Sequence, residues 1–435
     1  MTRATARAGQ KERGARPTRA RFAVLALVTA ATVLNYLDRS VMSVAARPMS
    51  AELGLSPGML GVIFSAFSWT YAAAQIPGGL LLDRLGTRLT YALSLIFWSA
   101  FTLLHGFAAN IGTLIGLRFG LGIAEAPCYP CNSRILATWF PQGERARATG
   151  VYSVGQYFGL AFLSPLLFWI VANWGWRSLF ILVGAIGIAF GLAWYGVYRD
   201  PVHSTRVNRV ELAHIAAGGG MGTTRTPPFS WARMGSLMAR RQVLGASLGQ
   251  FCSNSALVFL ITWFPTYLST ERHLDFVKSG FFVALPYVAA SLGVLSGGVV
   301  SDWLIRRTGS ATIGRKAPVV AGLLLVSTIL SLGAIRDNGL LIAVMSVAAF
   351  GQGLCNLGWT LISDVAPEGE IGLTSGIFNL CTNIAGIVTP MVIGFVVQAS
   401  GSFRGALVYI GSVALLGVLS YLFVIGDVRR LAADS

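Results

Sequence analysis

Twelve apolar segments of membrane-spanning length run through this chain and constrain its fold more than any other feature. A transmembrane helix needs about 20 mostly apolar residues. Only 11% of the 435 residues are charged, against about 25% in soluble domains. The sequence therefore predicts an all-α polytopic membrane protein with twelve transmembrane helices. The expected segments are 22–47, 58–82, 89–108, 111–134, 145–171, 178–198, 243–269, 277–304, 316–335, 340–363, 370–398 and 404–425.

The net charge of +16 raises the possibility of a nucleic-acid partner. The basic residues are not interleaved with aromatic residues, as they are in many such interfaces, and they cluster instead between the apolar segments. Cytoplasmic loops carry an excess of Lys and Arg, and with twelve spans the basic connections fall on one side. We therefore expect no nucleic-acid partner and place both termini in the cytoplasm. The connection with Asp364, Glu368 and Glu370 is acidic, but acidic residues contribute little to topology.

A long polar stretch near the middle of the chain divides the apolar segments into two groups of six. It contains Gly218-Gly-Gly-Met-Gly222 and Pro227-Pro228, which are typical of a flexible linker, with a short surface helix expected near 208–217. The predicted organisation is a cytoplasmic tail (1–21), a six-helix half (22–199), a cytoplasmic linker (200–241), a second six-helix half (242–426) and a cytoplasmic tail (427–435).

An internal repeat supports the division into two halves. Gly79-Leu-Leu-Leu-Asp83 follows the second segment, and Gly298-Val-Val-Ser-Asp302 follows the eighth. Many transporters consist of repeated halves that hold the substrate between them, near the middle of the bilayer.

Four ionisable residues lie within segments that otherwise read as membrane-spanning helices. Asp38 and Arg39 belong to the first segment, and Arg118 and Glu125 belong to the fourth. A charge at bilayer depth costs at least about 2.5–3.5 kcal/mol. Arg118 and Glu125 are seven residues apart, so they share one face of a helix. This pattern predicts a polar site inside the helix bundle that contains both positive and negative charges, as a coupled transporter needs.

The source of energy follows from what the sequence lacks. It has no G-x-x-x-x-G-K-[ST] motif, so no P-loop supplies ATP chemistry, and an ion gradient must do the work. Burial raises the pKa of a carboxyl group, whereas a nearby arginine lowers it. A carboxyl group subject to both effects can gain and lose a proton near the working pH. The alternative to a role in proton transfer is a structural ion pair of Arg118 with Asp38 or Glu125 that only holds the helices together. Buried ion pairs, however, contribute little to stability.

The loop after the second segment resembles the signature loop of the major facilitator superfamily. The matching pattern is Gly79-xxx-Asp83-Arg84-x-Gly86-x-Arg88, with Asp302 as its counterpart in the second half. The resemblance implies a cytoplasmic gate. Gly79 would permit close helix approach, Asp83 would cap a neighbouring helix N-terminus, and Arg84 and Arg88 would pair with acidic groups.

The chain also resembles the anion:cation symporter family, and within it the bacterial D-galactonate and other sugar-acid:proton symporters. The similarity spans nearly the whole chain. Its motifs include Asn35-Tyr-Leu-Asp-Arg39, Phe64-Ser-Ala-Phe67, Gln75-Ile-Pro-Gly-Gly79, Glu125-Ala-Pro127, Trp139-Phe-Pro141, Glu144-Arg145-Ala146, Gly155-Gln156, Thr262-Trp-Phe-Pro265 and Leu407-Val-Tyr-Ile410.

This resemblance implies roles for particular residues. Arg39 would contact the substrate carboxylate, Arg118 would relay charge, and Asp38 and Glu125 would carry protons. The residues expected to line the sugar-acid pocket are Tyr36, Tyr71, Gln156, Trp359 and Asn379. Asn356 would also face the substrate, at a position where the resemblance leads us to expect a serine. Because of this difference, the substrate could be an aldonate, an aldarate or a hexuronate.

The sequence thus predicts a proton-coupled symporter that imports an organic anion by alternating access. We expect a monomer, spanning the bilayer of a bacterial inner membrane, with co-transported protons and no cofactor. The alternatives are a sodium-coupled or other anion carrier, including one for inorganic anions, and a drug:proton exporter. A membrane-embedded enzyme fits least, because the four histidines are scattered and no H-E-x-x-H motif occurs.

Overall fold

The computed structural model describes residues 17–220, 231–367 and 370–431, and these residues form helices joined by short connections. The predicted tail segments 1–16 and 432–435, part of the linker (221–230) and Glu368 lie outside the described residues. The first group of helices is α2 (Ala20–Leu53), α3 (Pro57–His105), α4 (Ile111–Glu125), α5 (Cys128–Trp139) and α6 (Gln142–Val197). Between the groups lie η1 (Pro201–His203), α7 (Arg209–Ala217) and α8 (Trp231–Ala239). The second group is α9 (Arg241–Thr262), α10 (Phe264–Thr270), α11 (Phe276–Thr308), α12 (Ala311–Ser327), η2 (Thr328–Gly333), α13 (Asn338–Leu354), η3 (Cys355–Leu357), α14 (Gly358–Val365), α15 (Ile371–Ser400), α16 (Arg404–Leu419) and η4 (Ser420–Val424).

Two of the helices are too long to be single spans. Ten helical stretches of the described chain are long and apolar enough to cross a membrane. Among them, α3 has 49 residues and α6 has 56, which at 1.5 Å per residue is more than twice the thickness of the hydrocarbon core of a bilayer. Each is a pair of helices joined at a non-helical glycine, Gly86 in α3 and Gly175 in α6. Dividing them there gives the twelve predicted spans.

The two junctions require glycine for a backbone reason. Gly86 has φ 74° and ψ 167°, and Gly175 has φ 79° and ψ 166°. This region of backbone space is essentially restricted to glycine, because a Cβ atom would clash there. The chain can therefore reverse direction at these points with almost no loop.

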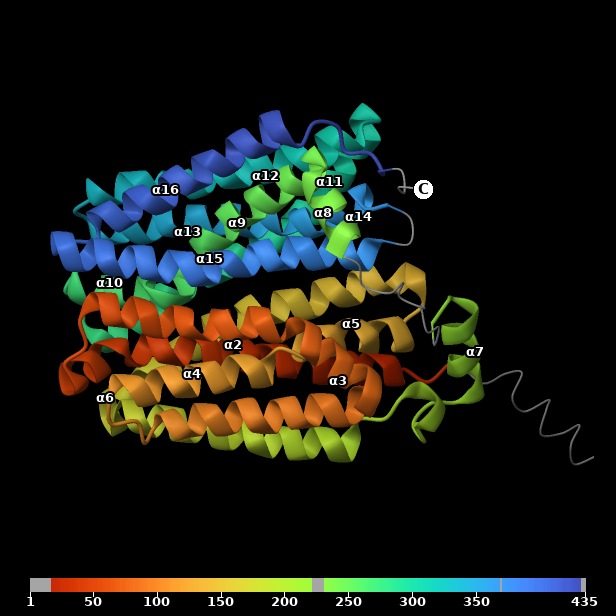
Figure 1. Ribbon diagram of the computed structural model, residues 1–435, viewed down its shortest axis with the longest axis horizontal. Helices are drawn as coiled ribbons and strands as arrows, with labels where there is room; N and C mark the ends of the chain where they lie inside the picture. The colour runs from red at the N-terminus through yellow and green to blue at the C-terminus, as the bar shows by residue number, and fades with distance from the viewer. Residues whose placement is uncertain (1–16, 221–230, 368–369, 432–435) are drawn as a thin grey trace, which may run out of the picture.

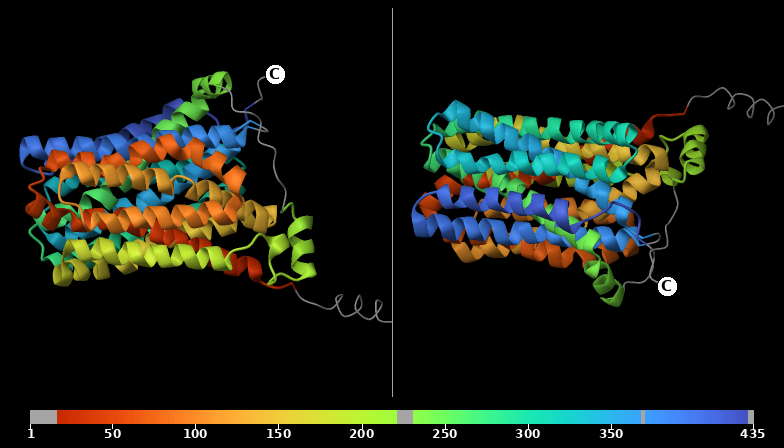
Figure 2. Two further views of the ribbon diagram at one scale, coloured as in Figure 1. Left: turned by 60° about the horizontal axis from the view of Figure 1, so that its bottom comes forward. Right: turned by 90° about the horizontal axis from the view of Figure 1, so that it is seen from above.

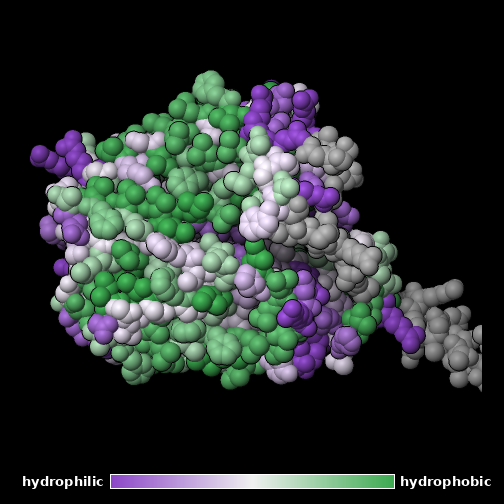
Figure 3. All heavy atoms as spheres, viewed as in Figure 1, coloured by the Kyte–Doolittle hydropathy of each residue, from purple (hydrophilic) through white to green (hydrophobic). Residues whose placement is uncertain are grey.

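The sides of the bundle are apolar. Figure 3 shows hydrophobic residues covering the flank of the helices, with hydrophilic groups gathered at the two ends. Large side chains such as Phe97, Phe158 and Leu192 are more than half exposed. A soluble monomer rarely exposes continuous apolar surface on this scale, so this surface is suited to contact with lipid.

The two groups of helices lie side by side as two halves (Figure 1). The contacts between them run mainly through α3 against α15 and through α6 against α11. The start of α2, α7 and the last described residues lie at one end of the bundle, here called the terminal end (Figures 1 and 2).

The helix expected near 208–217 is present as α7, and it is packed against the first half. The Glu211 side chain is buried and accepts hydrogen bonds from Thr18 Oγ1 at 2.5 Å, from the Ala20 amide at 3.1 Å and from Arg21 Nη1 at 3.0 Å. A carboxylate at this position satisfies free N–H groups at the start of α2 and complements its dipole. This part of the expected flexible linker is therefore docked; the predicted domain limits stay a prediction.

The halves meet at the end opposite the termini, here called the far end. Gln398 Oε1 accepts a hydrogen bond from Ser56 Oγ at 3.1 Å and from the Gly58 amide at 3.0 Å. Gly61 packs so closely that an added Cβ would lie 2.5 Å from the Pro390 carbonyl oxygen.

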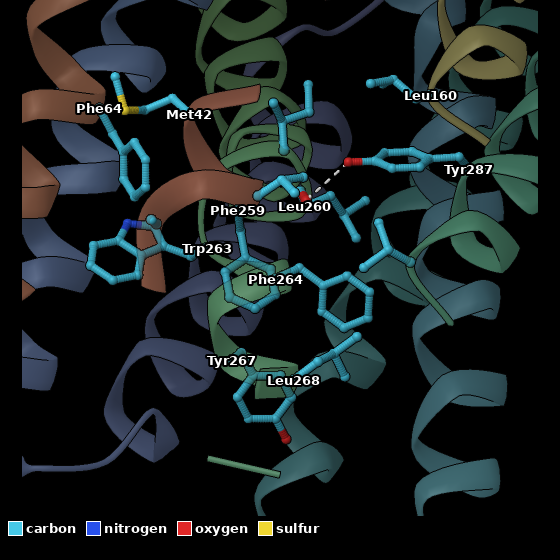
Figure 4. Packing of buried hydrophobic residues seen from close by; sticks show 14 of the residues in the cluster. Met42, Phe64, Leu160, Phe259, Leu260, Trp263, Phe264, Tyr267, Leu268 and Tyr287 are labelled. Carbon is cyan, nitrogen blue, oxygen red and sulfur yellow. Dashed lines mark hydrogen bonds between the residues drawn. The ribbon is translucent and has the colours of Figure 1, made fainter. Parts of the chain in front are cut away.

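Aromatic packing continues this far-end contact toward the middle of the molecule. The rings of Phe64 and Trp263 meet edge to face at 5.3 Å (Figure 4), and Trp263 Nε1 donates to the Pro390 carbonyl oxygen at 3.2 Å. In the same cluster, Tyr287 donates to the Leu260 carbonyl oxygen at 3.1 Å.

Ion pairs at the terminal end are arranged differently. Arg134 pairs with Asp83, Arg21 pairs with Glu211, and Arg315 pairs with Asp364. Each of these pairs joins residues of the same half or its docked linker. The far end is thus the end at which the two halves are bonded to each other.

Candidate functional site

A cavity lies between the two halves and has a different character on each wall. It contains about 640 Å³ of unfilled space, part of which is open to solvent. The wall from α2, α3 and α4 carries two cations, Arg39 and Arg118. The wall from α9 and α15 carries Asn254, Thr262 and Asn383 among apolar residues.

Arg39 and Glu125 form an ion pair in this site. Arg39 Nε lies 3.0 Å and Nη2 lies 2.5 Å from Glu125 Oε1. The Glu125 side chain is fully buried, and the Arg39 side chain is 21% exposed. A charge-assisted pair of this kind is among the stronger polar contacts in a protein, and it occupies the donors on one edge of the Arg39 guanidinium group.

Aromatic rings surround the same guanidinium group. The Arg39 Cζ atom lies 4.8 Å from the centre of the Phe67 ring, 5.1 Å from Tyr71 and 5.3 Å from Tyr36. Cations within about 6 Å of an aromatic ring gain from its quadrupole. The rings therefore hold the charge of Arg39 in place at the edge of the cavity.

Arg118 has no such partner. Its side chain lines the cavity although the residue is only 4% exposed. Its Nε atom is buried without a hydrogen-bond partner, and no carboxylate of the described chain lies within ion-pair distance. The alternative of a structural ion pair of Arg118 with Glu125 or Asp38 is not realised in the described structure, where Arg39 pairs with Glu125. Arg118 is thus a buried cation that faces the cavity.

Asp38 lies close to this group without bonding to it. The residue is 4% exposed, and its Oδ1 atom is buried without a hydrogen-bond partner. Its charge interacts with those of Glu125 and Arg118. The four ionisable residues predicted from the sequence are thus brought together, with Arg39 and Arg118 on the cavity wall and the two acids behind them.

A break in the fourth span sets the position of Glu125. Helix α4 ends at Glu125 and α5 begins at Cys128, with Pro127 between them. Proline lacks the N–H group that would continue the helical hydrogen bonds, although Ala126 and Pro127 both keep helical backbone angles.

Of the other predicted pocket residues, Tyr36 lines the cavity, whereas Tyr71, Gln156, Trp359 and Asn356 do not. Tyr71 contacts Arg39 from behind, and Gln156 is buried on α6. Trp359 packs its ring against Phe378 at 4.9 Å. Asn356, on η3, is partly buried. Their roles in substrate binding stay predictions.

Asn379 is connected to the cavity through a neighbour. Its carbonyl oxygen and its Oδ1 atom both accept hydrogen bonds from Asn383 Nδ2, at 2.9 Å and 3.2 Å. Asn383 itself lines the cavity. The predicted residue, Asn379, therefore lies one helical turn away from Asn383, which faces the cavity.

Four polar residues of the cavity were not predicted to face it. They are Ser68, Asn254, Thr262 and Asn383. Polar residues in membrane spans commonly bond to a neighbouring helix, and Asn254 does so by donating to the Thr382 carbonyl oxygen at 2.8 Å. A signal was available, because Asn254 and Asn383 stand within otherwise apolar segments.

The gate motif lies at the terminal end, and its contacts differ from the expected ones. A Cβ atom at Gly79 would meet nothing within 4 Å, whereas one at Gly78 would lie 3.1 Å from the Pro127 nitrogen. The expected close approach at Gly79 is thus wrong for this conformation, and Gly78 makes it. Asp83 accepts from Arg134 Nη1 at 3.1 Å rather than capping a helix.

Among the residues that the structure describes, the arginines of the motif have no acidic partner, contrary to expectation. Arg88 donates to the Tyr195 carbonyl oxygen from Nε and Nη2, at 2.9 Å and 2.7 Å. Arg84 is exposed. In the second half, Asp302 lies 3.6 Å from Arg315. In both halves the motif aspartate therefore pairs with an arginine of its own half.

Comparison with known proteins decides the family. The model of the Major Facilitator Superfamily matches residues 28–313 and 309–434. The chain belongs to the Major Facilitator Superfamily. The expected superfamily and fold class are therefore confirmed.

Two relatives of this superfamily member align over almost its whole length. The probable galactarate/D-glucarate transporter GudP of Escherichia coli (strain K12) is 41% identical over 428 residues, which cover 95% of each chain. The D-galactonate transporter of Escherichia coli O6:H1 is 41% identical over 423 residues, 96% of this chain and 98% of that one. Both relatives are named as transporters, which supports the interpretation of this superfamily member as a transporter rather than an enzyme.

Solved structures of the same superfamily fold are also similar. A bacterial homologue of the human lysosomal transporter Spinster, in an inward-facing and occupied conformation, has a TM-score of 0.73 at 21% identity and covers 94% of this chain and 97% of its own. A D-xylose–proton symporter has a TM-score of 0.73 at 15% identity and covers 94% and 99%. At these identities the likeness concerns the fold alone.

Proposed function

We propose that this protein is a proton-coupled symporter that imports a sugar acid, such as an aldonate or a related aldarate or hexuronate. The observation that carries the proposal is Arg118, a buried cation without an ion-pair partner in the described chain, facing a cavity between the halves. Leaving such a charge unpaired is costly. An anionic ligand in the cavity would compensate it.

A carboxylate is the anion that suits this wall best. The planar guanidinium group donates parallel hydrogen bonds that match the two oxygens of a carboxylate, and it keeps its charge at all working pH values. The substrate carboxylate would bind Arg118 and, once Glu125 has released it, Arg39.

Protons would compete with Arg39 for the carboxylate of Glu125. While Glu125 is ionised it holds Arg39 through the contacts at 2.5 Å and 3.0 Å. A proton on Glu125 removes the charge that attracts Arg39 and leaves the guanidinium group free for substrate. Asp38 would bind a second proton close by. Only a difference in interaction between the two states can drive such a shift.

The substrate class is supported by the names of the relatives. Proteins named as galactarate/D-glucarate, D-galactonate and L-galactonate transporters align with nearly the whole of this chain at 41%, 41% and 33% identity. Sugar acids combine a carboxylate, for the arginine wall, with hydroxyl groups, for the amides of the opposite wall.

Transport would proceed by alternating access. The far end, where the halves are bonded together, would be the periplasmic end, and the terminal end would face the cytoplasm of a bacterial inner membrane. Both termini would then be cytoplasmic, as the distribution of basic residues predicts. Gly79, Asp83, Arg84, Gly86, Arg88 and Asp302 would form a cytoplasmic gate, and one chain would suffice for transport.

A thermal-shift screen of the purified protein tests the substrate class. The ligands are sugar acids, tartrate, phosphate and lipophilic cations, and a specific ligand stabilises by about 2.7 kcal/mol at 100 times its Kd. We expect stabilisation by at least one sugar acid. Stabilisation by lipophilic cations and by no carboxylate would overturn the proposal in favour of a drug exporter.

Sodium coupling is the second candidate for the driving ion. Carboxylates bind both Na⁺ and protons, so the residues of the site do not separate the two by themselves. Uptake into proteoliposomes, measured with the pH gradient and the sodium gradient imposed separately, decides the matter. We expect uptake to follow the pH gradient alone; uptake that needs sodium would contradict proton coupling.

A further inference from the structure

We propose that the second wall of the cavity recognises hydroxyl groups and makes the site selective for sugar acids with one carboxylate over those with two. The inference deepens the proposed function and rests on it. It concerns three side chains outside the predicted set of binding residues, Asn254, Thr262 and Asn383.

The hydrogen bonds of Asn383 leave it with only an acceptor. Its Nδ2 atom donates to the Asn379 carbonyl oxygen at 2.9 Å and to Asn379 Oδ1 at 3.2 Å. An amide nitrogen has two protons, so both are used. A backbone carbonyl can only accept, which fixes the amide orientation. The free polar atom of Asn383 is Oδ1, which no donor of the described chain reaches and which is not buried.

Asn254 and Thr262 present acceptors in the same way. Asn254 Nδ2 donates to the Thr382 carbonyl oxygen at 2.8 Å, which fixes its orientation, frees Oδ1 and leaves one N–H. Thr262 uses its single proton on the Val258 carbonyl oxygen at 2.6 Å, so its hydroxyl oxygen can only accept. Neither oxygen receives a hydrogen bond from the part of the chain that the structure describes.

The cavity is therefore polarised across its width. Arg39 and Arg118 supply cationic donors on the first wall, and acceptor oxygens predominate on the second. A ligand that matches both walls has an anionic acceptor at one end and donors at the other. A sugar acid with one carboxylate and a hydroxyl-terminated chain meets this description.

A sugar acid with a second carboxylate, in place of the terminal hydroxyl group, would not match the second wall. The oxygens of this carboxylate accept hydrogen bonds and carry charge, so against this wall they would lose their hydration and gain at most the one free N–H of Asn254. Turning the ligand round does not help an acid with a carboxylate at both ends. A site built around hydrogen bonds to hydroxyl groups discriminates strongly against analogues that cannot make them.

The experiment compares matched ligands by calorimetric titration of the purified full-length protein. The ligands are galactonate, galactarate, which replaces the terminal CH₂OH group by a carboxylate, and 6-deoxygalactonate, which lacks the terminal hydroxyl. We expect galactonate to bind at least about tenfold more tightly than either of the others, the difference that one lost hydrogen bond makes.

Variants test whether the named wall is responsible. Asn383→Ala and Asn254→Ala are expected to weaken galactonate binding about tenfold and to reduce its advantage over galactarate. Asn173→Ala is the matched control, because Asn173 also donates Nδ2 to the carbonyl oxygen four residues earlier but is exposed outside the cavity. It should leave all three affinities unchanged. The two cavity variants are independent, so one that fails to fold leaves the other.

The outcomes separate this inference from the proposed function. If galactarate binds as tightly as galactonate, both carboxylates find cationic partners, and the inference is wrong while the sugar-acid function stands. If selectivity persists in both asparagine variants, the wall is not its source and the inference is also wrong. If no sugar acid binds at all, both the inference and the proposed function fail.

Discussion

At the scale of single residues, the site depends on which arginine is free. Arg39 has an acidic partner and three aromatic neighbours, whereas Arg118 faces the cavity without an ion pair among the described residues. The two residues are therefore expected to differ in role. Arg118 would attract the anion at all times, and Arg39 would do so only when Glu125 gives it up.

Replacing Arg118 tests its role directly. Arg118→Met keeps the length of the side chain and removes the charge, so we expect substrate affinity to fall by at least about tenfold, since a hydrogen-bonded charge contributes about 1.5–3 kcal/mol. The fold should remain intact, because an unpaired buried charge is lost. Calorimetric titration measures the affinity, and thermal unfolding checks the fold. Arg47→Met, at an exposed position, is the control; equal affinities for the two variants would remove Arg118 from the site.

The ionisable residues of the site were predictable from the sequence, but their pairing was not. Hydropathy makes Asp38, Arg39, Arg118 and Glu125 conspicuous, because each stands in an apolar segment. The spacing of residues fixes which side chains share a helix face, but it carries no information about distances between helices. The choice of Arg39 over Arg118 as the partner of Glu125, and the position of Asn383 rather than Asn379 on the cavity wall, both depend on such distances.

At the scale of elements, glycines and a buried carboxylate shape the ends of the helices. The limits of the spans were predictable because apolar length is dictated by the bilayer. The junctions at Gly86 and Gly175 replaced loops that the sequence analysis expected at 83–88 and 172–177. Hydropathy cannot distinguish a loop from two helices joined at one residue.

Alanine at Gly86 should destabilise the protein. Its φ of 74° with ψ of 167° is restricted to glycine, and forcing another residue there costs about 1–3 kcal/mol. Gly79→Ala is the matched control in the same loop motif, because its Cβ would meet nothing within 4 Å. Thermal unfolding in detergent should show a lower Tm for Gly86→Ala only. An unchanged Tm would contradict the backbone argument.

The docking of α7 is expected to depend on Glu211. Glu211→Gln removes the charge that bonds Arg21 and the start of α2, so stability should fall by about 1.5–3 kcal/mol. Glu52→Gln is the control, since Glu52 pairs with Arg177 on the surface, where ion pairs contribute little. Chemical unfolding followed by tryptophan fluorescence measures both. An equal loss in the two variants would show that the buried carboxylate has no special role.

At the scale of the whole molecule, the two halves are bonded at the far end and enclose a cavity between them. The fold was predictable, because twelve segments, a central linker and a repeated motif together specify it. The conformation was not, because a transporter sequence must be compatible with more than one state and encodes none of them alone.

Holding the far end closed should stop transport. Ser56 and Gln398 contact each other across the halves, so cysteines at both positions, joined by a short thiol-reactive linker, would prevent the halves from separating there. We expect uptake to be abolished by cross-linking and restored by cleavage of the linker. Either single cysteine variant, treated in the same way, is the control. Full uptake by the cross-linked protein would contradict alternating access through this end.

The central claim is that a proton on Glu125 releases Arg39 for the substrate. The most direct measurement compares proton-driven accumulation with substrate counterflow in proteoliposomes containing Glu125→Gln, which imitates the protonated acid. Because the amide cannot release its proton, we expect accumulation against a gradient to be lost while counterflow is partly retained. Accumulation equal to that of the unmodified protein would contradict the account.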